Sequence, residues 1–308
     1  MRLPEKPPEF SGLFEKGDLL ARLASSDEVN AIRLDADAKY VHWDKFRHRY
    51  TAPQGFALED VWRYVRLLRM SRLRLLPLVS PEGRPFRYSI PDCLHRDLVF
   101  VDQWAAGQFS MVEPRSLGRA ESDRYLVSSL MEEAITSSQF EGAAVTRPQA
   151  KEMLRTGRKP RDLSERMILN NYKAILELRD LKEEPLTLDM IHQLHRIITD
   201  RTLQDPGQAG RFRLPSEPVH VVDDRDSSIV YTPPPAEHLE ERVMRLCDFA
   251  NDTSEKEFMH PVIRAVLLHF GLAYEHPYVD GNGRTARALF YWYLLRSGYW
   301  LMEDLSSS

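Results

Sequence analysis

The sequence is poor in features that mark several classes of protein. Only two cysteines occur among 308 residues, Cys93 and Cys247, and their spacing matches no metal-binding pattern. This scarcity argues against a disulfide framework and favours a reducing compartment, although a single bridge between the pair stays open. The N-terminus lacks the apolar core of a signal peptide, and no long uncharged apolar run follows. We therefore expect a cytoplasmic protein that is neither secreted nor membrane-spanning.

Strong charge of one sign is also lacking. The formal net charge is −4, with 29% charged and 43% hydrophobic residues, which is ordinary for a soluble globular protein. This balance gives no general attraction to nucleic acid or anionic lipid. Arginines do recur at every third position from Arg63 to Arg72. We interpret them as a solvated or ion-paired helix face, with contact to nucleic acid or an acidic partner as the alternative.

Hydrophobic periodicity predicts a mainly α chain. The first part is a smaller, mostly helical N-terminal region of unknown role, residues 1–115, and a second domain covers residues 116–308. In the first part we predict a short strand at Tyr40 to Trp43, a helix at Ala57 to Leu76, a turn-rich hairpin at Ser80 to Pro91, a helix at Asp92 to Ala106 and a break at Pro114 to Gly118.

Nearly every segment of the second domain has a helical period. The predicted helices are Arg119 to Thr136, a piece at Gln139 to Glu141, Pro148 to Thr156, Ser164 to Leu181, Thr187 to Thr199, Ala236 to Asn251 and Met259 to Tyr274. The last of these has apolar residues on one face, including Val266 and Phe270, and we expect a buried helix. Apolar runs at Val219 to Val222 and Ile229 to Tyr231 flank a polar turn and predict a β-hairpin.

The most informative segment reads His-Pro-Tyr-Val-Asp-Gly-Asn-Gly-Arg-Thr-Ala-Arg, from His276 to Arg287. Its Gly281-Asn282-Gly283 turn precedes an apolar helical run. The first N–H groups of a helix have no partners within the helix, and the helix dipole favours an anion there. The turn therefore predicts a phosphate-binding site.

Charged residues around this turn supply the rest of a phosphate-transfer site. Arg284 and Arg287 are three residues apart, so both can reach phosphate oxygens from one side of the first helical turn. Asp280 offers the hard oxygen that Mg²⁺ prefers. His276 can accept a proton near neutral pH. Together these residues predict phosphoryl or nucleotidyl transfer.

Two other patterns in the sequence have ordinary explanations. The spacing Gly281-x-Gly283-x-x-Ala286 also satisfies a dinucleotide-binding fingerprint. That fingerprint requires a preceding strand in a βαβ unit, whereas the preceding segment here has a helical period. His192 and His195 share a helix face without the HEXXH pattern of a zinc site, so we interpret them as core or helix-end histidines.

The segment from His276 to Arg287 resembles the signature of the Fic (Fido) family, His-Pro-Phe-x-Asp/Glu-Gly-Asn-Gly-Arg-x-x-Arg. Tyr278 stands where phenylalanine is usual, and its hydroxyl needs a partner. The resemblance extends over about residues 120–300, with a core at about 185–300. It implies a Fic-type helical bundle with a small β-hairpin flap. It also implies transfer of AMP from ATP to a Ser, Thr or Tyr hydroxyl of a target protein.

The same resemblance implies a role for each residue of the motif. His276 would be the catalytic base, and Asp280 would bind Mg²⁺ on the co-substrate ATP. The nucleotide-binding residues would be Gly281, Asn282, Gly283, Arg284 and Arg287.

A second segment, Ser137-Ser138-Gln139-Phe140-Glu141-Gly142, resembles the family's inhibitory motif, Ser/Thr-x-x-x-Glu-Gly/Asn. Ser137 and Glu141 are four residues apart and so share a helix face. The resemblance implies an inhibitory helix at about residues 130–142, N-terminal to the core. Glu141 would pair with Arg287 and leave ATP bound in an unproductive pose.

ATP and a target protein with a hydroxyl side chain are the partners that the resemblance implies. Self-modification and a homodimer are compatible with it, whereas we expect no membrane or nucleic-acid partner. Family members often continue into a small winged-helix-like domain, and the resemblance leaves open whether one belongs to this protein. Two alternatives stay open: removal of AMP with Glu141 positioning water, and a non-catalytic nucleotide-sensing regulator that binds DNA through the arginines from Arg63 to Arg72.

Overall fold

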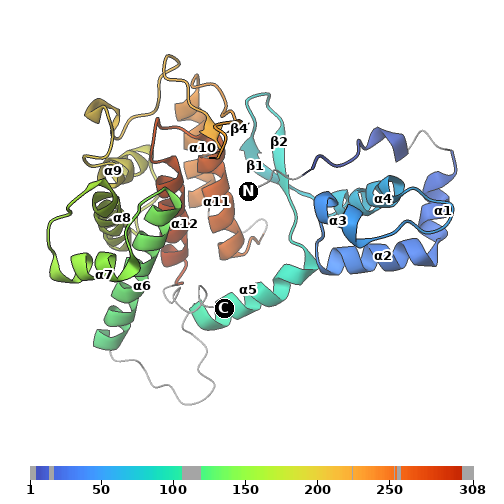
Figure 1. The fold of residues 1–308 in the computed structure, drawn as a ribbon, viewed down its shortest axis with the longest axis horizontal. Coiled ribbons are helices and arrows are strands. Elements are labelled where there is room, and N and C mark those ends of the chain that lie inside the picture. The colour runs from blue at the N-terminus through green and yellow to red at the C-terminus, as the bar shows by residue number, and fades with distance from the viewer. Residues whose placement is uncertain are drawn as a thin grey trace. The chain divides into compact units, whose positions relative to one another are not determined.

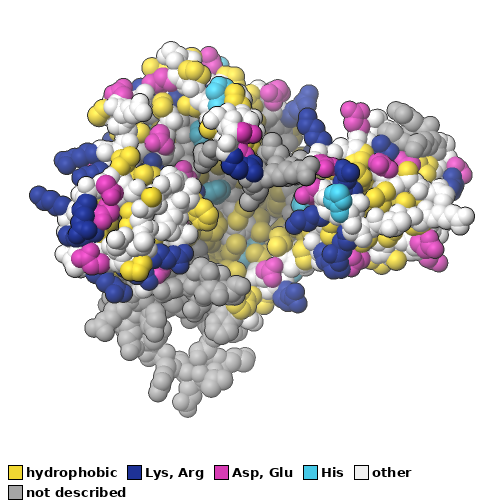
Figure 2. Space-filling model, in the orientation of Figure 1, with side chains coloured by type: hydrophobic (Ala, Val, Ile, Leu, Met, Phe, Trp, Pro, Cys, Tyr) yellow, Lys and Arg dark blue, Asp and Glu magenta, His cyan; other side chains and the backbone are white. Residues whose placement is uncertain are grey.

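A computed structural model describes residues 5–13, 17–105, 119–223, 225–252, 254 and 258–299 (Figure 1). These residues are mainly α-helical, and their strands form two small antiparallel hairpins. The predicted mainly α fold is confirmed. The chain divides into two compact units, Met1–Phe100 and Val101–Ser308. On the face drawn in Figure 2, basic and acidic side chains are interspersed, as the small net charge suggests.

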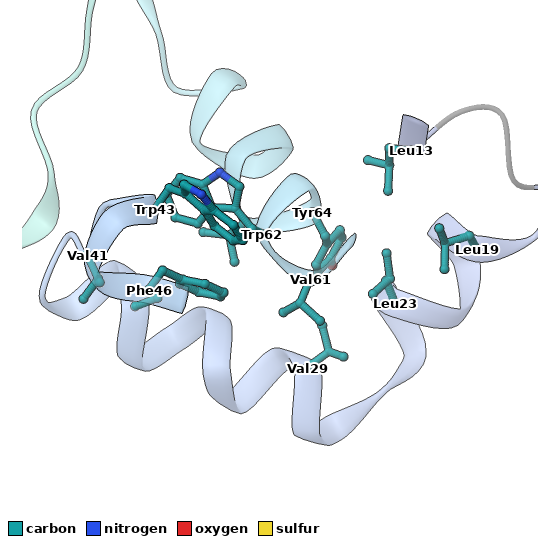
Figure 3. Packing of buried hydrophobic residues seen from close by; sticks show 12 residues of the cluster. Leu13, Leu19, Leu23, Val29, Val41, Trp43, Phe46, Val61, Trp62 and Tyr64 are labelled. Atoms are coloured by element: carbon teal, nitrogen blue, oxygen red, sulfur yellow. The ribbon is translucent and has the colours of Figure 1, made fainter. Parts of the chain in front are cut away.

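The first unit is a group of short helices followed by a hairpin. Its elements are η1 (Ser11–Leu13), α1 (Leu19–Ser25), α2 (Asp27–Ala38), α3 (Trp43–Arg49), α4 (Leu58–Met70), β1 (Arg74–Val79) and β2 (Pro85–Tyr88), after which α5 (Asp92–Ala105) begins. The helices surround an aromatic core, which Figure 3 shows. Phe46 is fully buried in this core, with its ring 5.0 Å from that of Trp62.

The strand predicted at Tyr40 to Trp43 is wrong. The chain turns at Tyr40, which has a φ of 42°, and Trp43 is the first residue of α3. The Trp43 side chain packs against Phe46 and Trp62, at ring distances of 6.3 and 5.9 Å. Burial of these rings against α4 decides the local structure, and tertiary packing overrides the β propensity of the segment.

The long helix predicted to Leu76 is wrong at its end. Helix α4 ends at Met70, and the next residues form β1, which pairs with β2. Leu76 and Leu78 are buried at a spacing of two, whereas Leu75 and Pro77 are exposed, so the period changes from that of a helix to that of a strand. The hairpin predicted at Ser80 to Pro91 is present and begins earlier than expected.

Two arginines of α4, Arg63 and Arg69, form hydrogen bonds within the first unit. Arg63 donates to a carboxylate oxygen of Asp60 at 2.6 Å and to the Glu9 carbonyl at 2.8 Å. Arg69 donates to Asp37 at 2.8 Å and to two backbone carbonyls. The ion-paired interpretation is confirmed for these two arginines. Their guanidinium groups are already occupied and are poorly placed to bind a nucleic acid.

The second unit is a helical bundle arranged around α12. Its elements are α6 (Arg119–Phe140), α7 (Arg147–Thr156), α8 (Leu163–Asp180), α9 (Leu188–Ile198), η2 (Pro206–Gln208), β3 (Val221–Val222), β4 (Ile229–Tyr231), α10 (Leu239–Asn251), α11 (Pro261–Glu275) and α12 (Asn282–Arg296). Helix α12, red in Figure 1, packs against α6, α8, α9 and α11. The Trp292 side chain on α12 is fully buried in this core.

The structure corrects two helices predicted for this unit. Helix α6 is continuous to Phe140, where we predicted a break after Thr136. The Ser138 hydroxyl donates to the Ala134 carbonyl four residues earlier, so this serine is accommodated inside the helix. Helix α11 is not wholly buried, because Val266 and Phe270 are 47% and 41% exposed. The buried side of α11 carries Ala265, Leu268, Gly271, Leu272 and Glu275.

The hairpin predicted between Val219 and Tyr231 is confirmed. Strand β3 pairs with β4, and Val221 lies opposite Tyr231.

Cys93 and Cys247 are both free. In the described part of the chain, no helix combines the length and the apolar character needed to cross a membrane.

Candidate active site

The loop between α11 and α12 reverses the chain with two left-handed residues. His276 ends α11 with a φ of 45°, and its N–H donates to the Leu272 carbonyl at 2.9 Å. Gly281 precedes α12 with a φ of 80°. A Cβ atom at Gly281 would lie only 2.8 Å from Cγ2 of Thr199. Glycine is therefore required here both by the backbone conformation and by the close approach of α9.

Asn282 closes this loop with its side chain. Its Oδ1 accepts the Tyr278 N–H at 2.8 Å, and its Nδ2 donates to the Tyr278 carbonyl at 2.8 Å. The side chain is buried, and these two bonds shape the turn. The first helical hydrogen bond of α12 runs from the Thr285 N–H to the Gly281 carbonyl. The backbone N–H groups of the preceding residues have no acceptor within the helix and can receive an anion.

Arg287 connects the start of α12 to α6. Its Nη2 donates to Oε1 of Glu141 at 2.5 Å, and its Nε donates to the Ser137 hydroxyl at 2.6 Å. Nη2 also donates to the Ser137 carbonyl at 3.1 Å. A side chain at Gly283 would overlap with Oε1 of Glu141. The Glu141 carboxylate thus lies directly over the turn that we predicted to bind phosphate.

Three contacts hold α6 and α12 together at a regular spacing. Glu133 is hydrogen-bonded to Tyr291, Ser137 to Arg287, and Glu141 lies against Gly283. Each step moves four residues forward on α6 and four residues back on α12, as expected for antiparallel helices. Burial raises the pKa of Glu133, while Tyr291 and Arg287 lower it.

Glu141 directly follows the C-terminal end of α6, where a carboxylate is unfavourable. Gly142 adopts a left-handed conformation, with a φ of 89°, and the Ala143 N–H donates to the Ser138 carbonyl at 3.0 Å. The C-terminal end of a helix carries partial negative charge, which repels an acidic side chain. Arg287 offsets this repulsion. The two side chains are 22% and 30% exposed, and an ion pair of that exposure contributes about 1 kcal/mol or less.

His276 is half-buried at the end of α11. Burial lowers the pKa of His276, the nearby Arg213 lowers it further, and a hydrogen bond to the Ala273 backbone together with the Glu141 and Asp280 carboxylates raises it. The Ala273 carbonyl can accept the proton of only one ring nitrogen. The other nitrogen of the neutral ring then offers a lone pair, as a general base requires.

Two buried arginines fix the backbone around His276. Nε of Arg213 donates to the His276 carbonyl at 3.0 Å, and its backbone N–H donates to the Pro277 carbonyl at 2.8 Å. Arg242 donates to Glu275 at 2.7 Å, and both side chains are almost fully buried. Sequence patterns assigned no role to Arg213, because the His276 carbonyl that it holds lies 63 residues away in the chain.

Asp280 is the predicted metal ligand, and its carboxylate is 57% exposed. Oδ1 accepts the Gly281 N–H at 2.5 Å, and Oδ2 lies 3.7 Å from Nη2 of Arg284. Among the described residues, no group of three or more His, Cys, Asp or Glu side chains could hold a metal. Mg²⁺ on a nucleotide usually takes one or two carboxylates together with phosphate and water. A single solvent-facing carboxylate beside the turn that we predicted to bind phosphate therefore fits that ion.

Arg284 is buried below the same turn. Its side chain is 2% exposed, and Nη1 donates to the Ile198 carbonyl at 3.2 Å. In the described part of the chain, its Nε atom is buried without a hydrogen-bond partner. Burial lowers the pKa of Arg284. An unpaired donor on a buried cation is costly, and a phosphate oxygen would satisfy it.

Comparison with known proteins identifies a domain around this site. Residues 185–294 match the Fic/DOC family. The chain carries a Fic domain. The matched residues contain α9 to α11, most of α12 and the whole loop from His276 to Arg287, whereas Ser137 and Glu141 precede them in sequence.

Curated relatives share this part of the chain. The protein adenylyltransferase Fic of Nematostella vectensis is 37% identical over 118 residues, which are 38% of this chain and 25% of that protein. Protein adenylyltransferase fic-1 of Caenorhabditis elegans is 33% identical over 118 residues, which are 38% of this chain and 21% of that protein. The matched region thus spans a quarter or less of these relatives.

Solved structures support the Fic fold. A Fic domain containing signaling protein from Bacteroides thetaiotaomicron has a TM-score of 0.53 and 26% identity, over 66% of this chain and 73% of that chain. A structure of Fic-1 from C. elegans has a TM-score of 0.54 over 94% of this chain and 81% of that chain. Its 19% identity makes this second likeness a statement about fold alone. The predicted Fic-type helical fold is confirmed.

Proposed function

We propose that the protein is an adenylyltransferase that moves AMP from ATP to a Ser, Thr or Tyr hydroxyl of a target protein. The observation that carries this proposal is the loop between α11 and α12. It places a half-buried imidazole, an exposed carboxylate and a free helix N-terminus within six residues, from His276 to Gly281. Relatives named as protein adenylyltransferases, 33% and 37% identical over the Fic domain, support the same chemistry.

ATP would bind with its phosphates at the start of α12. The N–H groups of the first turn would donate to phosphate oxygens. The unpaired Nε of Arg284 would reach the same anion from below. Arg287 would provide a further guanidinium once Glu141 leaves it. Asp280 would hold Mg²⁺, which would neutralise phosphate charge.

His276 would act as the base. Its neutral ring would take the proton of the target hydroxyl as that oxygen attacks the α-phosphorus of ATP. The new bond joins the hydroxyl oxygen to the α-phosphorus, and the bond to the bridging oxygen of the β-phosphate breaks. Pyrophosphate leaves with the electron pair of that bond. Backbone N–H groups at the start of α12 would stabilise the charge that develops on the α-phosphate.

Glu141 would keep this activity low. Its carboxylate occupies Arg287 and lies over Gly283, where a phosphate would otherwise approach. The exposed ion pair alone is weak, so the two contacts from Ser137 to Arg287 would strengthen the inhibited arrangement. Removal of the Glu141 carboxylate would free both the guanidinium and the turn.

The β3–β4 hairpin would present the target. Val222 and Ile229 are 47% and 58% exposed, so the hairpin offers apolar side chains beside a short strand edge. An extended segment can bind such an edge by adding a strand. A target segment bound there would bring a hydroxyl toward His276, and a segment of a second copy of the chain would allow self-modification.

The test uses ATP labelled in either the α- or the γ-phosphate. We expect Glu141→Gly protein to become labelled from α-labelled ATP and to remain unlabelled with γ-labelled ATP. Glu141→Gly/His276→Ala protein serves as the matched control and should take up neither label. Label from the γ-phosphate would show phosphoryl transfer and contradict the proposal.

Removal of AMP is the second candidate. The Glu141 carboxylate is partly exposed beside the phosphate-binding turn, so it can accept a hydrogen bond from a water molecule there. Wild-type and Glu141→Gly protein would each be incubated with a purified AMP-modified protein and Mg²⁺. Loss of AMP with wild type alone would favour removal over addition as the reaction that Glu141 serves.

A further inference from the structure

Helix α9 carries two histidines that meet the loop between α11 and α12. His192 and His195 are three residues apart, so both project from one side of α9. The His195 ring stacks on the ring of Tyr278, with centroids 3.6 Å apart and planes 5° from parallel. The Tyr278 side chain is fully buried. The loop is therefore packed against α9 through this ring pair.

The hydrogen bonds of His195 fix its tautomer. The Gly210 N–H donates to Nδ1 at 2.9 Å, so Nδ1 must carry a lone pair. The ring proton therefore lies on Nε2, which is 2.9 Å from the Asp280 carbonyl oxygen and donates to it. A ring with a lone pair on Nδ1 and a proton on Nε2 is the neutral form of the imidazole. The main chain of Asp280 is thereby tied to α9.

His192 satisfies the hydroxyl of Tyr278. Nδ1 of His192 lies 3.1 Å from the hydroxyl oxygen. A buried hydroxyl without such a partner is costly. Phe212 packs on the His192 ring at 4.4 Å and holds it in place. This contact gives a physical reason why the chain can have tyrosine at a motif position where phenylalanine is usual.

The loop thus has a fixed side and an open side. On the fixed side, His195 holds the Asp280 carbonyl, and a Cβ atom at Gly281 would lie 3.3 Å from Nε2 of His195. On the open side, the Asp280 carboxylate is exposed to solvent. Because the backbone of a residue limits where its side chain can reach, contacts to the carbonyl also set the place of the carboxylate.

We propose that His195 is a positioning residue, which holds Asp280 and the following glycine turn where Mg²⁺ and ATP phosphates require them. The His192–Tyr278 hydrogen bond secures the same loop. Neither histidine needs to touch the substrate. The kinetic part of this inference rests on the proposed adenylyl transfer, whereas the packing part does not. A displacement of about 1 Å near reacting atoms can lower a rate by about 100-fold.

Two variants of His195 separate the hydrogen-bond donor from the ring. In the Glu141→Gly background, His195→Phe keeps a ring for stacking on Tyr278 but removes both hydrogen bonds. His195→Gln keeps an N–H donor for the Asp280 carbonyl and loses the ring. We expect the Phe variant to lose about 10- to 100-fold in kcat and to need more Mg²⁺ for half-maximal rate, and the Gln variant to lose less.

Rates are taken per folded molecule, well below the melting temperature. A purely structural role for His195 would lower the melting temperature of both variants while kcat and the Mg²⁺ midpoint stay unchanged, and that result would overturn the proposal. A larger loss in the Gln variant than in the Phe variant would assign the effect to stacking and would overturn the role of the donor.

A double-mutant cycle tests the His192–Tyr278 contact without any assay of activity. Tyr278→Phe and His192→Leu each remove one partner, and the double variant replaces both with apolar groups. We expect each single variant to lower the melting temperature by about 2–4 °C, and the double variant to recover most of that loss. Melting shifts that simply add would overturn this contact as a positioning device.

The outcomes separate this inference from the proposed function. If the melting shifts are coupled but no variant, Glu141→Gly included, transfers AMP, the proposed function is contradicted and the packing part of the inference is supported. If the Glu141→Gly protein transfers AMP quickly and His195→Phe does not change that rate, the proposed function is supported and the positioning role is contradicted.

Discussion

Single residues set the protonation state of this site. Burial, the largest influence, lowers the pKa of His276 below its ordinary value of 6.5. The imidazole is therefore neutral at about pH 7 and ready to accept a proton. The lowered pKa also makes the folding stability depend on pH. Because the folded-state pKa lies below the unfolded one, this group contributes stability above pH 6.5, and that contribution is lost as pH falls through the lowered value.

This leads to a pH prediction. The rate of AMP transfer should be flat above about pH 7 and should fall on the acid side with a midpoint below 6.5. Glu141 raises the pKa of His276, so the midpoint of the Glu141→Gly variant should lie lower than that of wild type. Initial rates across a pH series measure both midpoints. A midpoint that moves upward in the variant would contradict this electrostatic coupling.

Ser137 provides a second prediction at the residue scale. Ser137→Ala removes the 2.6 Å bond to Nε of Arg287 and leaves the contact with the Ser137 carbonyl in place. A hydrogen bond to a charged group contributes about 1.5–3 kcal/mol. We therefore expect a rise of roughly tenfold in AMP transfer, smaller than that of Glu141→Gly. Initial rates with labelled ATP measure it. Ser138→Ala is the matched control, since the Ser138 hydroxyl donates within its own helix, and an equal rise there would contradict the prediction.

The motif residues were the part of the site that could best be predicted from the sequence. His276, Asp280 and Arg287 lie within one short motif, so their proximity follows from their spacing alone. Glu141 is 146 residues from Arg287, and only the resemblance to an inhibitory motif linked the two. The roles of His195 and Arg213 could not be predicted, because both act on loop carbonyls far away in sequence.

Helices α6 and α12 determine whether Glu141 reaches its partner. Their contacts repeat every four residues, from Glu133 with Tyr291 to Glu141 with Gly283. The contact at Tyr291 lies two helical turns from Gly283. We therefore expect it to hold the register of α6 against α12 and not to act through nucleotide binding at the loop.

A Tyr291→Phe substitution tests this register. Glu133 would lose a donor while it remains largely buried, and the hold of α6 on α12 would weaken. We expect AMP transfer to rise by about 3- to 10-fold in wild type and to stay unchanged in the Glu141→Gly background. Tyr293→Phe on the same helix is the control and should change neither. A rise that persists without Glu141 would contradict an effect through the inhibitory contact.

Boundaries of elements were harder to predict than their type. The serines near the end of α6 resembled a break, yet their hydroxyl groups are accommodated by the helix and its neighbours. Residues after Met70 continued an apparent helix pattern, but Arg74 and Leu75 pair as a strand with Tyr88 and Arg87. In both cases contacts distant in sequence decide the outcome, and local propensity does not register them.

At the scale of the whole molecule, the chain consists of two units with separate cores. The sequence suggested two regions from a composition break, and the Fic motifs explain only the second. The core of the first unit is aromatic and self-contained, with Phe46 fully buried among Trp43 and Trp62. No motif in that region indicates a chemistry, so its role did not follow from sequence.

Separate cores predict separate responses to core mutation. Phe46→Ala should destabilise the first unit by about 3–5 kcal/mol and leave nucleotide binding by the second unit unchanged. Calorimetric melting with and without ATP would show a lowered transition that ATP does not affect. Leu178→Ala, at a fully buried position of α8, should give the reverse pattern. Equal shifts of both transitions in both variants would contradict independent cores.

The most direct measurement is the intact mass of the protein after incubation with ATP and Mg²⁺. Glu141→Gly protein should gain the mass of one or more adenylyl groups, wild type should gain much less, and the Glu141→Gly/His276→Ala protein should gain none. An unmodified Glu141→Gly protein that also fails to modify any protein in a cell extract, or equal modification with and without His276, would contradict AMP transfer from this site.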